Sequence, residues 1–141
     1  MPIVLPYDTE SVHYAAGELR SGGVVAFATE TVYGLGARTM DAEAIEKLYA
    51  LKRRPADNPL IAHVLDVASA RPLVAAWPVE ASLLASACWP GPLTMILHKA
   101  ASVPLAATGG RDTIAIRSPR HPLARALPAD FHGHNCYGEH F

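Results

Sequence analysis

Short apolar runs alternate along this chain with longer segments that show the spacing of amphipathic helices. The apolar runs are rich in β-branched residues and cover residues 24–28, 60–64, 93–98 and 113–117. Runs of this length fit buried strands better than helices. The helical segments begin near residues 9, 41, 67, 79 and 121. This alternation predicts the α/β class, with one twisted, mixed sheet flanked by helices.

Capping residues mark the ends of the first two helices. Asp8 or Thr9 can cap the first helix, and Asp41 can cap the second. The second helix should end by Arg54, because the residue before Pro55 is pushed out of the α region. One face of this helix carries apolar residues that we expect in the core: Ala44, Ile45, Leu48 and Leu51.

The composition is that of a globular protein with balanced charge. Half of the 141 residues are hydrophobic and 18% are charged, which suits one domain with one core. Twelve lysines and arginines stand against 13 acidic residues, so the formal net charge is −1. No overall basic field therefore favours nucleic-acid binding, and any anion site must be built from local charge.

The N-terminus and the two cysteines point to a reducing compartment. The first ten residues lack the pattern of a signal peptide, and two cysteines provide no disulfide framework. No apolar run approaches the roughly 20 residues that span a bilayer. We therefore expect a cytoplasmic protein that makes no membrane contact.

The stretch "LKRRPADNPLIAH" concentrates positive charge at the end of a helix. Lys52 and Arg54 stand two residues apart, just before a loop that two prolines stiffen and that carries Asn58. Cations at this place also complement the helix dipole, for about 0.3–1 kcal/mol each. Paired cations beside a rigid loop suit a polyanion such as a nucleoside triphosphate equally well. The spacing leaves both interpretations open.

Polar residues also follow the predicted strands. Residues 29–37, "TETVYGLGA", are predicted to be a turn-rich connection after the first strand, at the kind of strand end where α/β proteins bind ligands. Arg117 ends the last strand, with Thr113 on the same face; it is either a solvated charge or a clamp on a carboxylate. His63, at the end of another strand, is by itself more typical of a core residue. Neither GxGxxG nor GxxxxGK[ST] occurs, so an ordinary Rossmann or Walker site is not supported.

Four blocks in order give the chain a specific resemblance to a known family. The blocks are "ATETVYGLGA", "LKRRPADNPLIAHV", "CWPGPLTMIL" and "TIAIRSPRHPLA". Together they resemble the threonylcarbamoyl-AMP synthase (YrdC-like) family over most of the chain. The resemblance implies a twisted mixed sheet around a deep, positively lined cavity.

The resemblance also implies an activity. The family consists of nucleotidyltransferases that condense L-threonine, bicarbonate or carbon dioxide, and ATP into threonylcarbamoyl-AMP and pyrophosphate, with Mg²⁺ accompanying ATP. The product feeds N6-threonylcarbamoyladenosine formation in tRNA through a separate tRNA threonylcarbamoyl transferase. Transfer RNA or double-stranded RNA is a candidate partner.

Carried over by position, the resemblance assigns roles to seven residues. Thr31, His63 and Arg117 would contact the threonine substrate, Arg117 through its carboxylate. ATP would be held by Lys52, Arg54, Asn58 and Thr113. Lys52 and Arg54 match the family's lysine-x-arginine signature and would carry the catalysis, with Arg53 pointing elsewhere.

The chain departs from the family pattern mainly after residue 127. There the family has a strand and a serine-x-asparagine motif that closes over the nucleotide, whereas this chain has "PADFHGHNCYGEHF". We therefore expect a YrdC-like domain over 1–127 that is incomplete, truncated or frame-shifted at its C-terminal end, and an atypical tail over 128–141. The tail's metal-like residues match no strong zinc pattern, so no metal site is predicted: His132, His134, Cys136 and His140.

Two further functions compete with the synthase. The first is a non-catalytic YrdC-like module that binds a nucleotide or RNA. The second is the related carbamoyl-transfer domain of hydrogenase-maturation proteins, which are larger chains with zinc-finger and acylphosphatase-like parts. Threonine-dependent release of pyrophosphate separates the synthase from the binding module.

Overall fold

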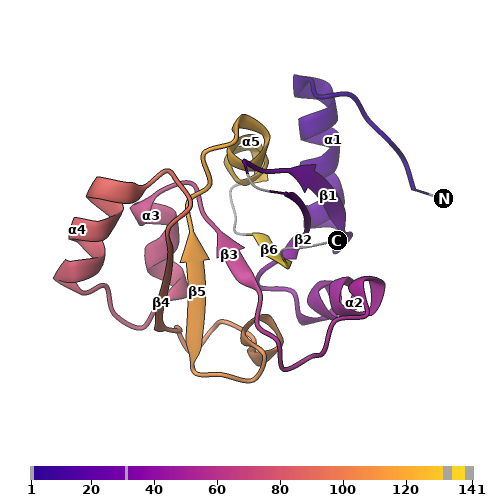
Figure 1. The fold of residues 1–141 in the computed structure, drawn as a ribbon. Coiled ribbons are helices and arrows are strands. Elements are labelled where there is room, and N and C mark those ends of the chain that lie inside the picture. The colour runs from indigo at the N-terminus through magenta and orange to yellow at the C-terminus, as the bar shows by residue number, and fades with distance from the viewer. Residues whose placement is uncertain (1, 31, 132–134, 139–141) are drawn as a thin grey trace.

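A single mixed sheet forms the centre of the molecule in the computed structural model, which describes residues 2–30, 32–131 and 135–138 (Figure 1). Its described strands are β1 (Val25–Ala28), β2 (Tyr33–Arg38), β3 (Ile61–His63), β4 (Thr94–His98), β5 (Thr113–Arg117) and β6 (Asn135–Gly138). Their spatial order is β1-β2-β6-β3-β5-β4. β3 and β5 run parallel, and the other neighbours are antiparallel. The predicted mixed α/β sheet is confirmed.

Helices flank this sheet on both sides. They are α1 (Thr9–Arg20), α2 (Ala42–Lys52), α3 (Val67–Ala70), α4 (Val79–Cys88) and α5 (Pro122–Phe131), with 3-10 helices η1 (Arg71–Leu73) and η2 (Leu105–Thr108). Both predicted caps form: the Asp8 carboxylate accepts from the Ser11 N–H at 2.7 Å, and Asp41 accepts from the Ala44 N–H at 3.1 Å. No helix in the described part of the chain is long and apolar enough to cross a membrane.

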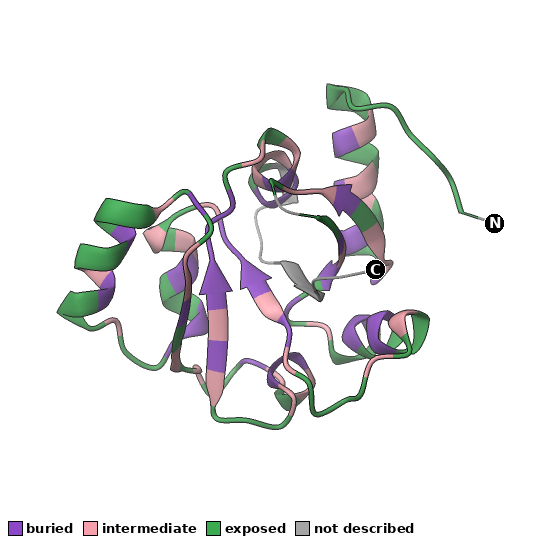
Figure 2. Cartoon of the chain, in the orientation of Figure 1, coloured by how far each residue is buried: buried purple, intermediate pink, exposed green. Residues whose placement is uncertain are grey.

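The core is divided into clusters that lie on the two faces of the sheet. Figure 2 shows where the buried residues fall along each element. Ile114 and Ile116 of β5 pack with α2, η1 and η2 on one face. On the other face, α1, β1 and α5 form a second cluster around Leu19 and Phe27. The prediction that the two isoleucines face one way is confirmed. Arg117, one residue on, therefore points to the opposite face.

The expectation that residues 29–37 form a turn-rich connection is wrong for most of the segment. Residues 33–38 form β2, which pairs with β1 as a hairpin, with Phe27 opposite Gly34. Gly36 is needed for packing rather than for a turn. A Cβ at Gly36 would lie 2.7 Å from Cε1 of Phe27, so the missing side chain makes room for the aromatic ring.

The predicted tail over 128–141 takes part in the fold where the structure describes it. Residues 128–131 complete the last turns of α5, and β6 lies between β2 and β3, antiparallel to both. A strand that is hydrogen-bonded to a neighbour on each side is held through its backbone and needs no apolar periodicity of its own. The hydrophobic pattern of the sequence therefore gives no sign of β6. His132, His134 and His140 lie outside the described residues.

The apolar face of α2 differs from the prediction at its C-terminal end. Ala44, Ile45 and Leu48 are fully buried, whereas the Leu51 side chain is 68% exposed. Tyr49 takes the last core position instead, because the i, i+1, i+4, i+5 stripe of a 3.6-residue helix has turned away from Leu51 by then.

Leu48 and Leu51 form a matched pair for a stability test. We expect Leu48→Ala to lower the free energy of unfolding by about 3 kcal/mol, because it leaves a cavity at a fully buried position. Leu51→Ala should change it by less than about 0.5 kcal/mol. Urea unfolding followed by circular dichroism measures both, and equal losses would contradict the packing described for α2.

Candidate functional site

A buried arginine and a buried histidine lie side by side at the ends of the parallel strands. His63 of β3 and Arg117 of β5 are register partners, and they are 0% and 2% exposed. The His63 ring meets Phe27 edge-on, with ring centroids 5.9 Å apart. Burial, and then the positive charge of Arg117, hold the pKa of His63 well below its usual value. The imidazole is therefore neutral, and the positive charge of this pair belongs to Arg117.

The Arg117 guanidinium is fixed by contacts from two other segments. Its Nε–H donates to the Gly91 carbonyl at 3.1 Å, and Nη2 donates to Oε1 of Glu30 at 2.5 Å. The side chains of Arg117 and Glu30 are 2% and 22% exposed, so this ion pair is largely shielded from water. A buried cation needs such a counter-charge, because an unpaired one costs several kcal/mol.

Glu30 also binds the segment that leads into α5. Its Oε1 accepts from the Arg120 backbone N–H at 2.9 Å, and its Oε2 accepts from the His121 N–H at 3.2 Å. Partial burial acts to raise the pKa of Glu30. The backbone bonds, that from Arg120 foremost, and the Arg117 guanidinium outweigh this effect and lower the pKa to about 2. Sequence reasoning missed Glu30; the signal was an acidic residue directly after a buried strand.

This depressed pKa predicts a loss of stability in acid. The folded state favours the Glu30 carboxylate, so its contribution is complete above about pH 4.5 and is lost as the pH falls towards about 2. The Glu30 side chain keeps 22% of its surface exposed. Solvent screening therefore limits the expected effect to the order of 1–2 kcal/mol. The free energy of unfolding in urea is measured for Glu30→Gln and for the unmodified chain. The difference between the two proteins should be larger at about pH 6 than at about pH 2.5, by the amount given above. The same difference at both pH values would contradict the network.

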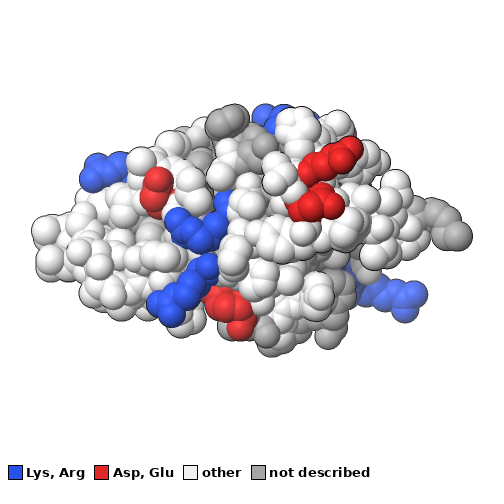
Figure 3. Space-filling model, turned by 90° about the horizontal axis from the view of Figure 1, so that it is seen from above, with Lys and Arg blue, Asp and Glu red and all other residues white. Residues whose placement is uncertain are grey.

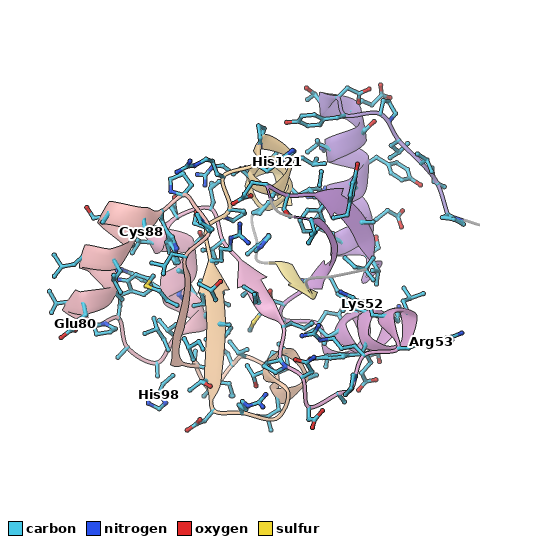
Figure 4. The ribbon with its side chains drawn as sticks, viewed as in Figure 1. Lys52, Arg53, Glu80, Cys88, His98 and His121 are labelled. Carbon is cyan, nitrogen blue, oxygen red and sulfur yellow. The ribbon has the colours of Figure 1, made fainter. Side chains whose placement is uncertain are left out.

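Lys52, Arg53 and Arg54 diverge because the helix ends between them. Arg53 is the C-cap of α2 and has left-handed backbone angles, φ 50° and ψ 38°. It is exposed and projects away from the sheet, as expected, whereas Lys52 lies on the side of α2 facing the sheet (Figure 4). Both Lys52 and Arg54 are half-buried. The left-handed turn thus places the two predicted site cations apart from the one between them.

Arg54 orders the loop that carries Asn58. Its Nε–H donates to the Asn58 carbonyl at 3.2 Å, and Nη2 donates to the Pro59 carbonyl at 2.7 Å. The Tyr49 hydroxyl donates to the same Asn58 carbonyl at 2.7 Å. From the other side, Nη1 of Arg111 donates to the Asp57 carbonyl at 2.8 Å. Residues 55–59 are therefore held by their backbone oxygens, with the Asn58 side chain exposed.

Gly109 and Gly110 form a second matched pair beside this loop. Both have positive φ, but only at Gly109 would a Cβ meet backbone, at 2.7 Å from the Asp57 carbonyl oxygen; at Gly110 nothing lies within 4 Å. Each alanine substitution should cost about 1–2 kcal/mol through backbone strain. Gly109→Ala should cost at least about 1 kcal/mol more, because the Asp57 loop must move. Equal losses in urea unfolding would contradict this contact.

The predicted site residues fall into two groups at opposite ends of β5. Arg117 and His63 form one group. Thr113 begins β5, roughly 13 Å from Arg117 by the rise of a strand, at the end where η2 and the loop before β5 meet residues 55–59. Lys52, Arg54 and Asn58 belong to α2 and the loop that follows it. Thr31 lies outside the described residues.

The face of the molecule seen from above is not continuously basic in its described residues. Basic side chains gather near its centre with acidic side chains beside them (Figure 3). A largely apolar cavity of about 500 Å³ lies between the N-terminal arm, α1 and β1. A second cavity, of about 590 Å³, is lined by residues 87–90, 92 and 93 and by Arg120. Neither is lined by a predicted site residue, and the deep, positively lined cavity stays a prediction. In the described part of the chain, no three His, Cys, Asp or Glu side chains cluster as metal ligands.

The fold and the site define the class of protein before any comparison. It is an α/β protein whose parallel strands end in a buried arginine with a neutral histidine beside it. A family model described as "Telomere recombination", which covers the Sua5, YciO and YrdC proteins, matches residues 18–134. The chain therefore belongs to the Sua5/YciO/YrdC family, as the resemblance in the sequence predicted.

Named relatives of known sequence and structure share this domain. The threonylcarbamoyl-AMP synthase of Pyrococcus abyssi is 48% identical over 82% of this chain, and that of Halorhodospira halophila is 43% identical over 86%. The crystal structure of P. abyssi Sua5 complexed with L-threonine superimposes on 95% of the chain with a TM-score of 0.91 and 42% identity. The chain spans 34% of the P. abyssi sequence, 64% of the H. halophila sequence and 39% of the chain in that crystal structure.

Proposed function

We propose that this chain acts in the synthesis of threonylcarbamoyl-AMP from L-threonine, bicarbonate or carbon dioxide, and ATP. The observation that carries the proposal is the buried Arg117, held in a fixed orientation beside neutral His63. Membership of the family and the synthase relatives at 48% and 43% identity support it. So does the similarity to a Sua5 structure that contains L-threonine.

The threonine would bind at the His63–Arg117 end of the strands. A guanidinium is suited to a carboxylate because its planar N–H groups match the two oxygens. We assign the threonine carboxylate to Arg117 and a neutral hydrogen-bonding contact to His63. Thr31, in the segment that follows Glu30, is proposed as a further threonine contact. A buried site of this kind selects a polar substrate over an apolar one, because an apolar substrate would leave the buried polar groups of the site without hydrogen bonds.

ATP would bind at the other end, over the lysine-x-arginine pair. We assign its phosphates to Lys52 and Arg54, and further contacts to Asn58 and Thr113. Arg54 also holds the Asn58 carbonyl, so it would order the loop as well as face the nucleotide. Mg²⁺ would enter with ATP, bound mainly by phosphate oxygens and water, which is its usual mode.

The reaction calls for cations rather than for a base. An oxygen of the threonine carbamate attacks the α-phosphorus of ATP, a P–O bond forms, and the bond from that phosphorus to the bridging oxygen of pyrophosphate breaks. Nucleophile and phosphate are both anions, so the barrier lies in repulsion and positioning, which Lys52 and Arg54 would lower. The carbamate already carries its charge, so no proton is removed from it in this step.

The product would serve tRNA modification. A carbamoyl adenylate is a mixed anhydride, and such an activated acyl group needs an enzyme that transfers it. We propose the tRNA threonylcarbamoyl transferase as the next enzyme, with N6-threonylcarbamoyladenosine as the final product. Direct contact of this chain with tRNA or double-stranded RNA is a separate proposal, and the mixed charge of the surface in Figure 3 does not add to it.

Lys52→Ala and Arg53→Ala test the proposed site with a matched pair of neighbouring cations. With L-threonine, bicarbonate, Mg²⁺ and ATP, the unmodified chain should release pyrophosphate only when threonine is present. Lys52→Ala should lower this rate at least a hundredfold, because removing one preorganised charge costs about 3 kcal/mol of transition-state stabilisation. Arg53→Ala should retain it within about twofold, since that side chain points away from the site.

The competing function is a module that binds without turnover. It shares the fold, and it predicts binding of ATP or RNA with no threonine-dependent pyrophosphate at all. That result for the unmodified chain would contradict the proposed synthesis. Equal rates of pyrophosphate release for Lys52→Ala and Arg53→Ala would contradict only the role assigned to Lys52, not the proposed synthesis.

A further inference from the structure

Glu30 forms a polar junction at the end of the parallel strands. Three N–H groups point at its carboxylate: Nη2 of Arg117, and the backbone amides of Arg120 and His121. These donors lie 87, 90 and 91 residues from Glu30 in the sequence. A single side chain thus ties the turn between β1 and β2 to the segment between β5 and α5.

The junction determines how the arginine is presented. The Arg117 guanidinium is held through two different nitrogens, Nε on the Gly91 carbonyl and Nη2 on Glu30, and two such bonds fix both its plane and its direction. Gly91 is itself anchored, because its N–H donates to the Ser118 carbonyl at 2.8 Å. The orientation of Arg117 is therefore set before any ligand arrives, which is the condition for a preorganised site.

We propose that Glu30 is a positioning residue for amino-acid binding: it stays bound to Arg117 while the substrate is held and orients the guanidinium for the substrate carboxylate. This inference rests on the proposed function, because it takes the ligand of Arg117 to be an amino acid. Glu30 acts through Arg117 and has no chemical step of its own.

Two other roles for Glu30 fit the geometry less well. A general base would need a pKa near the working pH, and three donors keep this carboxylate ionised far below it. A placeholder, displaced by the substrate carboxylate, would have to give up three hydrogen bonds to two segments of the chain. Two of them hold the two residues just before α5, so displacement would also release residues 120–121 from the hairpin.

The test compares Glu30→Gln with Glu46→Gln, a glutamate exposed on α2, by calorimetric titration of L-threonine and of Mg²⁺–ATP in separate experiments. The amide nitrogen that Glu30→Gln introduces would face an N–H of the segment 120–121, so the junction should open. We expect Glu30→Gln to weaken threonine binding at least tenfold and to leave ATP binding within about twofold. Glu46→Gln should leave both unchanged.

The outcomes separate this inference from the function on which it rests. Failure of the unmodified chain to bind threonine would overturn the proposed function. Threonine binding that is normal in the unmodified chain and unchanged in Glu30→Gln would overturn the positioning role only. Tighter threonine binding in the variant would also overturn it, in favour of a displaced placeholder. Equal losses for threonine and ATP would reduce Glu30 to general support of the fold.

A measurement on the unmodified chain covers the case in which Glu30→Gln does not fold. The Nε–H of Arg117 is buried and bonded, so it should give one slowly exchanging NMR signal. Saturation with L-threonine should leave that signal slow and nearly unshifted, because the positioned guanidinium does not reorient. Rapid exchange, or a large shift on binding, would overturn the proposal.

Discussion

The contact between Glu30 and Arg117 is the interaction on which the arrangement of the site depends. It joins two residues 87 positions apart and lets a cation remain 2% exposed inside the sheet. Without the carboxylate, the guanidinium would either move out of the core or stay buried, desolvated and without a counter-charge. If it moved out, β5 would lose its last residue. The hairpin, the parallel strands and α5 are therefore held together electrostatically at the place where they meet.

The second half of the site is organised by backbone geometry rather than by an ion pair. A left-handed residue at Arg53 ends α2, and the oxygens of residues 55–59 accept bonds from Arg54, Tyr49 and Arg111. At the other end of β5 from this loop's neighbour Thr113, Arg117 lies roughly 13 Å away by the rise of a strand. A strand of five residues thus sets a spacing between the proposed amino-acid end and the proposed polyphosphate end of the site.

Local chemistry predicted much of this structure, and long-range pairing accounts for what it missed. Asp8 and Asp41 cap helices as expected, since capping involves residues three apart. β2 was hidden by its two glycines, of which Gly36 makes room for Phe27. β6 was hidden because its sequence is held mainly through its backbone. His63 and Arg117 were identified from family motifs. Glu30 was missed because its partners are about 90 residues away, where no spacing rule reaches.

The most direct test of the account is hydrogen exchange at the backbone amides of Arg120 and His121. Both donate to Glu30, so in the unmodified chain they should exchange slowly and remain slow at saturating L-threonine. Fast exchange of both amides in the free protein would contradict the junction itself. Slow exchange that becomes fast with threonine would show that threonine displaces Glu30, contrary to a fixed ion pair between Glu30 and Arg117.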